Sequence, residues 1–184
     1  MSGTLNLKLL TAALLVMALM IYENVSFSPA VADDIDSQAE IDMVGPDGLP
    51  IIFQWIERDD LSKIEEYLDA GGNIEVPGFQ SATPLIYAAG ADSWVVSLAL
   101  VRRGADLTAV DRRGFNMPWL AATSRVKSGS REHAALMEVR RYLEKAGLSG
   151  PHIEPNAAKV LMADKSCDAG NIVRLIKCKG TQHD

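Results

Sequence analysis

The chain has 184 residues, of which 48% are hydrophobic and 23% are charged, and its formal net charge is −6 at pH 7. This length suits one domain with enough apolar material for a core. Acidic side chains dominate residues 33–75, whereas basic side chains outnumber acidic ones in residues 76–184. An acidic total, without a basic stripe interleaved with aromatic residues, argues against nucleic-acid binding.

An apolar segment opens the chain. Lys8 precedes the apolar run 9–21, which has the length of a signal-peptide core and is short for a membrane span. Ala30 and Ala32 occupy the two small-residue positions that a signal peptidase reads. We therefore expect residues 1–32 to be a signal peptide and the mature chain to be periplasmic, with no membrane contact after cleavage. An uncleaved membrane anchor is the alternative.

Three prolines follow at a regular spacing. Pro50, Pro84 and Pro118 stand 34 residues apart, and each lies just inside the start of an apolar stretch. A period of this length is typical of stacked supersecondary units, which cannot bury their apolar faces alone.

The middle copy shows what each unit contains. Thr83 and Pro84 have the chemistry of a helix start, with a hydroxyl that caps free N–H groups and a proline at the first helical position. A turn at 90–93 separates this short helix from a second one that begins at Trp94. Gly104 suits the end of that second helix, and an extended loop or hairpin leads to the next copy. The predicted unit is helix, turn, helix, hairpin.

The segments 82–89 (ATPLIYAA) and 104–114 (GADLTAVDRRG) resemble the ankyrin repeat family. The family's usual histidine is Ile86 here, and its usual capping threonine is Leu49 in the first copy and Met117 in the third. The resemblance implies an all-α repeat fold, a short ankyrin-type solenoid of helix–turn–helix–hairpin units with helical capping segments.

The resemblance also divides the chain. The repeats are expected over 48–148, as copies at 48–81, 82–115 and 116–148, with an insertion near 124–131 in the third copy. Residues 33–47 are the expected N-terminal cap, and residues 149–184, with two apolar helical patterns, are the expected C-terminal cap.

Cys167 and Cys178 are the two cysteines of the chain, with ten residues between them. In an oxidising compartment a loop this short can close as a disulfide, which contributes about 3 kcal/mol by the loop-entropy relation. We expect a disulfide that ties down the C-terminal segment; two unrelated thiols are the alternative.

The sequence offers no catalytic or metal-binding pattern. His133, His152 and His183 make no metal-ligand spacing with another histidine, a cysteine or a carboxylate. Asp59 and Asp60 stand at the start of a predicted helix, where carboxylates favour the positive end of the dipole. We therefore expect no enzymatic activity, no cofactor and no metal.

In the ankyrin family, recognition uses the hairpin tips and the exposed face of the first helices, and the resemblance implies the same here. The residues at those positions are Phe53, Gln54, Phe79, Gln80, Tyr87, Arg112, Arg113 and Phe115. Aromatic residues and arginines are the types that carry interface energy. Phe79 and Phe115 have a second interpretation, as residues that pack under their own loops.

These observations indicate an exported, non-catalytic module for protein–protein interaction. By family resemblance, its partner would be a toxin that acts on the cell envelope, which the chain neutralises as an immunity protein. The alternative is an accessory factor in oxidative-stress defence, and a small enzyme is the less favoured one.

The leader yields a direct prediction. Protein recovered from a periplasmic fraction should begin at Asp33, because cleavage after the Ala30-Val31-Ala32 signature removes the apolar core. N-terminal sequencing checks this. Recovery of the whole chain in the membrane pellet would contradict it.

Overall fold

In the part of the chain that the structure describes, all regular secondary structure apart from two isolated β-bridges is helical. The computed structural model describes residues 41, 43–150, 152–164 and 171–181, all within a unit that spans 39–184. Residues 1–40 lie outside the described residues, so the predicted signal peptide lies outside them too. None of the described helices is long and apolar enough to cross a membrane.

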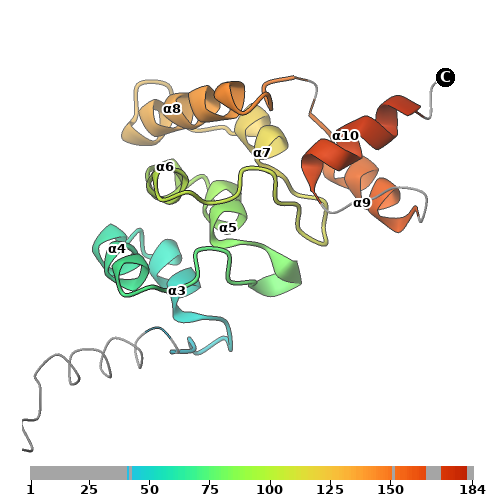
Figure 1. Cartoon of the computed structure of the whole chain (residues 1–184). Helices are drawn as coiled ribbons and strands as arrows, with labels where there is room; N and C mark the ends of the chain where they lie inside the picture. Colours follow the sequence, from blue (N-terminus) through green and yellow to red (C-terminus); the bar gives the residue numbers. More distant parts are fainter. Residues whose placement is uncertain (1–40, 42, 151, 165–170, 182–184) are drawn as a thin grey trace, which may run out of the picture. The chain divides into compact units, whose positions relative to one another are not determined.

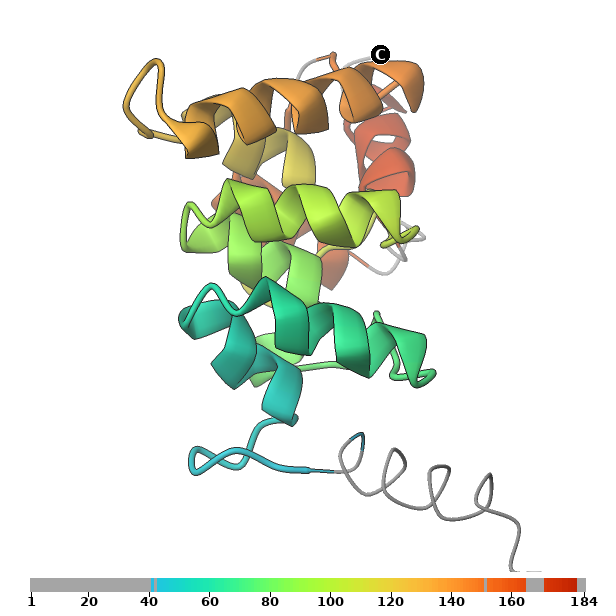
Figure 2. The same ribbon diagram turned by 90° about the vertical axis from the view of Figure 1, so that its left-hand side faces the viewer.

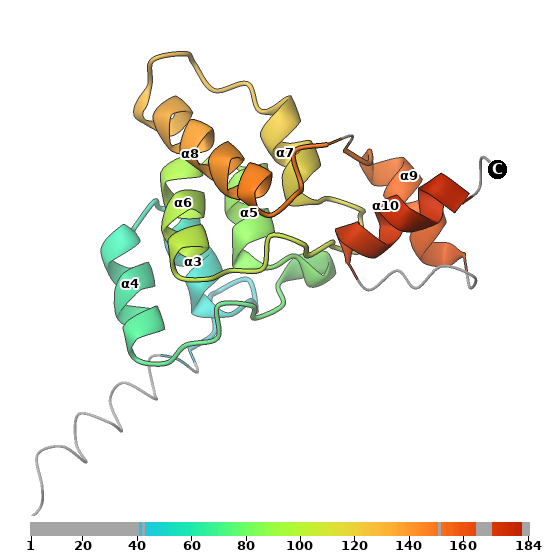
Figure 3. The same ribbon diagram turned by 45° about the horizontal axis from the view of Figure 1, so that its top comes forward.

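The helices come in consecutive pairs (Figure 1). The first three pairs lie one above another in chain order, with the second helix of each pair in an outer row and the first helix inside it (Figures 2 and 3). The pairs are α3 (Ile51–Glu57) with α4 (Leu61–Asp69), α5 (Pro84–Gly90) with α6 (Trp94–Arg102), α7 (Met117–Thr123) with α8 (Arg131–Lys145), and α9 (Pro155–Ala163) with α10 (Ile172–Thr181). A short 3₁₀ turn, η1 (Phe79–Ser81), lies between α4 and α5.

Side-chain caps begin several of these helices. The Thr83 hydroxyl accepts the Ile86 N–H at 3.3 Å, with Pro84 in the first turn, as the sequence predicts. In α7 the cap is Asn116, whose side-chain oxygen accepts the Trp119 N–H at 3.0 Å. Met117 stands where the family has its capping threonine, and the cap of α7 lies one residue before it. An amide oxygen can accept this bond, whereas a thioether is only a weak acceptor.

The turns inside the first two pairs share one conformation. Asp59 and Asp92 each follow a first helix with a positive φ, 51° and 59°. Aspartate is one of the few residues besides glycine that adopts this left-handed region readily. Asp60 then caps α4, accepting the Lys63 N–H at 3.2 Å, which agrees with its predicted place at a helix start.

The first helices form the centre of the core. Helices α3, α5 and α7 contact each other in series, and α6 packs on α8. Ala88 and Ala121 are buried on α5 and α7, where small side chains let neighbouring helices approach. Trp94 is fully buried at the start of α6.

The third pair is longer than the first two. Residues 124–130 separate α7 from α8, and α8 has 15 residues where α6 has nine. The extra length predicted near 124–131 is therefore divided between a longer connection and a longer second helix.

The segments expected to cap the repeats differ from each other. Of residues 33–47, the described part from Met43 onward forms one arm of a hairpin, closed by a bridge between Val44 and Pro50. The helical patterns of the C-terminal segment are confirmed as α9 and α10. These two helices lie beside the third hairpin, residues 108–116, which is closed by a bridge between Val110 and Asn116 (Figure 3).

Two hydrogen bonds attach the C-terminal segment to the third hairpin. The Asn116 side-chain N–H₂ donates to the Ile153 carbonyl at 3.0 Å, and the Ile172 N–H donates to the Thr108 carbonyl at 2.8 Å. Gly114 lies so close to Pro155 that a Cβ there would fall 2.1 Å from the Pro155 carbonyl oxygen. Cys178 lies on α10, but Cys167 lies outside the described residues, so the disulfide stays a prediction.

Trp94 joins two helix pairs. Its indole N–H lies 2.9 Å from both an Asp92 carboxylate oxygen and the Ser124 hydroxyl, and its ring is fully buried. The side chain therefore contributes both apolar burial and polar bonds to the contact between the second and third pairs.

We predict that Trp94→Ala destabilises the chain by roughly 3–5 kcal/mol, the usual loss for truncating a buried tryptophan. Trp94→Phe keeps most of the ring and should cost less, because it loses chiefly the indole hydrogen bonds, worth about 1 kcal/mol each. Urea unfolding followed by circular dichroism measures both. Equal stability of parent and Trp94→Ala would show that this residue does not hold the pairs together.

Candidate functional site: a groove across the first helices

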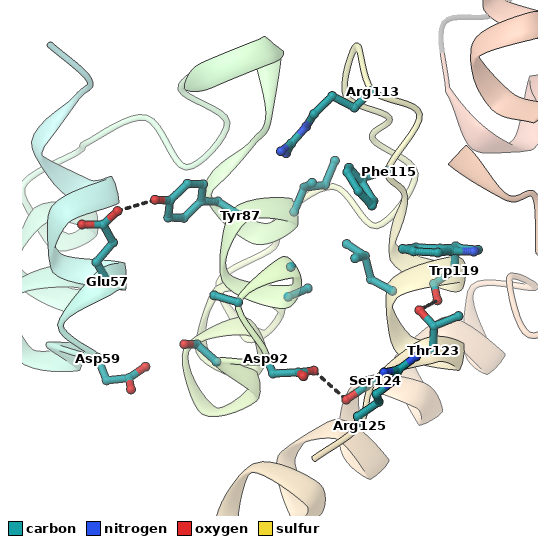
Figure 4. A pocket seen from close by; sticks show the side chains of 16 residues that line it. Glu57, Asp59, Tyr87, Asp92, Arg113, Phe115, Trp119, Thr123, Ser124 and Arg125 are labelled. Atoms are coloured by element: carbon teal, nitrogen blue, oxygen red, sulfur yellow. Dashed lines mark hydrogen bonds between the residues drawn. The ribbon is translucent and has the colours of Figure 1, made fainter. Parts of the chain in front are cut away.

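A groove of about 800 Å³ runs across the first helices. Its lining comes from the end of α3, the second half of α5, helix α7 and the third hairpin (Figure 4). Because one pair after another contributes to it, the groove depends on the packing of α3, α5 and α7.

One side of the groove is acidic. Glu57 ends α3, and Asp59 and Asp92 lie in the two left-handed turns (Figure 4). Glu57 and Asp59 are exposed, and Asp92 is half-buried. Three carboxylates thus face the groove from two consecutive helix pairs.

Tyr87 stands between the first two pairs. Its hydroxyl donates to Glu57 Oε1, and its ring meets the ring of Phe53 edge-on with the centroids 5.2 Å apart. The hydrogen bond to Glu57 raises the pKa of Tyr87 to about 12, and burial and the nearby charges of Glu57 and Asp47 act in the same direction. The phenol therefore stays protonated and serves as a fixed donor.

A buried carboxylate organises the third hairpin. Asp111 is fully buried, and its Oδ1 accepts the backbone N–H groups of Arg113 and Phe115, both at 2.9 Å. Its Oδ2 accepts from Arg113 Nε at 2.8 Å and Nη2 at 2.7 Å. The guanidinium is thereby held over the Phe115 ring, 4.8 Å from its centroid. Because two nitrogens of the guanidinium contact this one carboxylate oxygen, the position of Arg113 at the groove is fixed.

The opposite side of the groove is aromatic. The rings of Phe115 and Trp119 have their centroids 5.3 Å apart at an angle of 52°, and both side chains are half-buried. Below them, the Ser124 hydroxyl donates to Asp92 Oδ1 at 2.7 Å, which joins the end of α7 to the turn after α5 (Figure 4).

The structure brings three of the predicted contact residues together, since Tyr87, Arg113 and Phe115 all line the groove. Gln80 and Arg112 lie at neighbouring hairpin tips, joined by a hydrogen bond of 2.9 Å from the Arg112 N–H to the Gln80 carbonyl. Phe79 is 59% exposed beside them. This exposure argues against its packing under its own loop.

The expected exposure of the first-helix positions is wrong for Phe53, which is only 1% exposed. The loop at 76–82, between α4 and α5, covers its ring, because a Cβ on Gly78 would lie 2.5 Å from the Phe53 ring. Gln54 is half-buried. Phe53 therefore packs against the Tyr87 ring inside the protein and offers no surface to a partner.

Sequence reasoning missed most of the polar lining. The sequence alone explains Asp59 as part of a helix start and Asp92 as part of a turn. The one available signal was their shared place after a first helix, 33 residues apart. Asp111 is a further residue of this kind, although an aspartate in a turn commonly accepts the backbone N–H two residues further along the chain.

A second hollow, of about 500 Å³, lies between α7, α8 and the segment that follows them. Its lining includes Ala121, Met137, Arg140 and Gly150. The Arg140 guanidinium donates from Nη2 to the Ala121 carbonyl at 2.7 Å. That guanidinium therefore helps to hold α8 on α7.

The described residues contain no group of three or more histidine, cysteine or carboxylate side chains that could hold a metal ion. No protein-family model matches the sequence. A search of curated proteins found no match either.

We predict that Asp111→Ala destabilises the chain by about 2 kcal/mol, because backbone donors in a half-buried hairpin lose their acceptor. Asp111→Asn should cost less, since the amide oxygen can still accept both N–H groups. Thermal unfolding gives the stabilities, and amide hydrogen exchange at Arg113 and Phe115 reports the hairpin itself. Unchanged exchange at both amides in the alanine variant would contradict this role.

Proposed function

We propose that residues 48–148 form an ankyrin-type solenoid. The resemblance in the sequence is supported by the recurrence of local features in the described residues. A proline lies at the start of each of α3, α5 and α7 or within one residue of it. Gly71, Gly104 and Gly147 follow the second helices with φ of 91°, 92° and 73°.

Contacts between the pairs support the same proposal. Side-chain hydrogen bonds between neighbouring pairs join residues 30 to 37 positions apart, close to one period of the prolines. One of them runs from the Asp106 N–H to Glu75 Oε1 at 2.6 Å. Burial raises the pKa of Glu75 there; the hydrogen bond from the Asp106 N–H acts against this rise, and the charge of Asp106 adds to it.

We propose further that the chain is a non-catalytic, protein-binding module and that the groove is its recognition surface. The observation that carries this proposal is that three consecutive first helices present prearranged polar and aromatic side chains along one groove. Side chains fixed before binding lose less entropy when a partner docks. The exposed hairpin residues Phe79 and Arg112 would extend this surface.

The hydroxyl groups of the groove favour binding over chemistry. Tyr87 donates to Glu57, Ser124 donates to Asp92, and the Thr123 hydroxyl donates to the Trp119 carbonyl at 2.8 Å. A nucleophilic hydroxyl needs a neighbouring base of suitable pKa that is itself oriented by a third group. The described lining of the groove contains no histidine that could act as this base.

A substitution that fills the groove tests the proposal. Gly90 lines the groove, its φ is not left-handed, and a Cβ there would meet nothing within 4 Å. We expect Gly90→Trp to abolish capture of the natural partner while leaving the melting temperature close to that of the parent. The measurement is affinity capture from an envelope extract, followed by mass spectrometry and by titration with the purified partner.

Gly150→Trp is the matched control. Its Cβ also meets nothing within 4 Å, but it lies at the second hollow. Gly150→Trp should bind the natural partner as tightly as the parent does. The double variant Phe79→Ala, Arg112→Ala should bind it more weakly without losing it. If Gly150→Trp blocks capture and Gly90→Trp does not, the groove is not the recognition surface. The captured protein also decides the role, since an envelope toxin supports immunity and a peroxide-removing enzyme supports stress defence.

A further inference from the structure

The acidic residues of the groove keep acceptor capacity for a partner. Glu57 Oε1 accepts from Tyr87, and Asp92 Oδ1 accepts from Trp94 and Ser124. The second oxygen of each carboxylate, and both oxygens of Asp59, accept no hydrogen bond from the described part of the chain. Carboxylate oxygens that still have acceptor capacity attract cations and hydrogen-bond donors.

The cations of the groove do not balance these charges. Arg113 is paired with the buried Asp111, so that pair adds no net charge. Arg125 is then the remaining cation in the lining, against the three carboxylates of Glu57, Asp59 and Asp92. The groove therefore carries a net negative charge, which favours a positively charged occupant.

The other side of the groove selects a different kind of group. Phe115 and Trp119 present half-buried rings opposite the carboxylates (Figure 4). Rings of this kind bind an apolar or aromatic side chain by removing it from water. A ligand that fits both sides of the groove therefore carries a positively charged group close to an apolar one.

Given the proposed role of the groove in protein recognition, we infer that it accepts a segment of the partner protein that presents lysine or arginine next to an apolar side chain. The cation lies against Glu57, Asp59 and Asp92, and the apolar side chain packs on Phe115 and Trp119.

The negative charge at Asp59 and Asp92 is separable from the fold. Both turns need a residue that tolerates positive φ, and asparagine meets this need as well as aspartate does. An amide oxygen at position 92 can also accept the bonds from Trp94 and Ser124, and a glutamine at position 57 can accept from Tyr87. Glu57→Gln, Asp59→Asn and Asp92→Asn together therefore remove three charges and keep the local bonds.

Two synthetic peptides test the inference, with the sequences Gly-Phe-Lys-Gly-Phe-Lys-Gly and Gly-Phe-Glu-Gly-Phe-Glu-Gly and with both ends blocked. NMR titration of the ¹⁵N-labelled full chain should show shifts at Asp59, Asp92, Phe115 and the Trp119 indole with the lysine peptide only. The triple neutral variant should bind the lysine peptide about tenfold more weakly, as expected for three partly exposed charges. Higher salt should weaken binding to the parent more than to the variant.

The control is a second triple variant, Glu65→Gln, Glu66→Gln and Glu144→Gln. It also loses three exposed negative charges, but none of these residues lines the groove. It should bind the lysine peptide like the parent. Equal binding of both peptides, or no loss in the neutral variant, would overturn the inference. If Gly90→Trp loses the captured partner while the neutral variant keeps it, this inference fails and the proposed function stands. If Gly90→Trp keeps the partner, the proposed function itself fails.

Discussion

Packing of short helices on one another is the constraint on which this fold depends. Helices α3, α5 and α7 have seven residues each, far below the length at which an isolated helix is stable in water. Each one exists because its apolar side chains are covered by the helices before and after it. Buried residues such as Ile52, Leu85 and Leu120 recur on these helices for this reason.

The groove follows from the same packing. When first helices lie in series, their last turns and the turns that follow them come together along one face. Polar bonds between the pairs then fix the side chains there: Tyr87 reaches Glu57 on one neighbour, and Asp92 reaches Ser124 on the other. Asp111 does the same for the third hairpin from inside a buried position. The site is therefore rigid without help from a ligand.

The sequence predicted local structure better than it predicted the surface. Helix starts at Thr83 and Pro84, the second helix from Trp94 and the helical C-terminal segment were readable, because caps and apolar spacing act over a few residues. The burial of Phe53 was not readable, since it results from a loop that begins more than 20 residues later.

The groove itself was only partly predictable. Tyr87, Arg113 and Phe115 were found because aromatic residues and arginine draw attention at predicted surfaces. The carboxylates were not, because an aspartate in a turn has a sufficient local explanation in its backbone conformation. The packing of the helix pairs decides which turns lie on the same face of the protein. This packing cannot be read from a single sequence.

Gly90 and Ala91 leave the floor of the groove free to vary in sequence. Both residues line the groove and are exposed, and a side chain at Gly90 would touch nothing. The residues that hold the pairs together, such as Trp94 and Asp111, are different ones. If the groove is the recognition surface, as proposed, substitutions at its floor could change what it binds at little cost in folding. The residues that hold the helix pairs together would then stay the same while the groove floor varies.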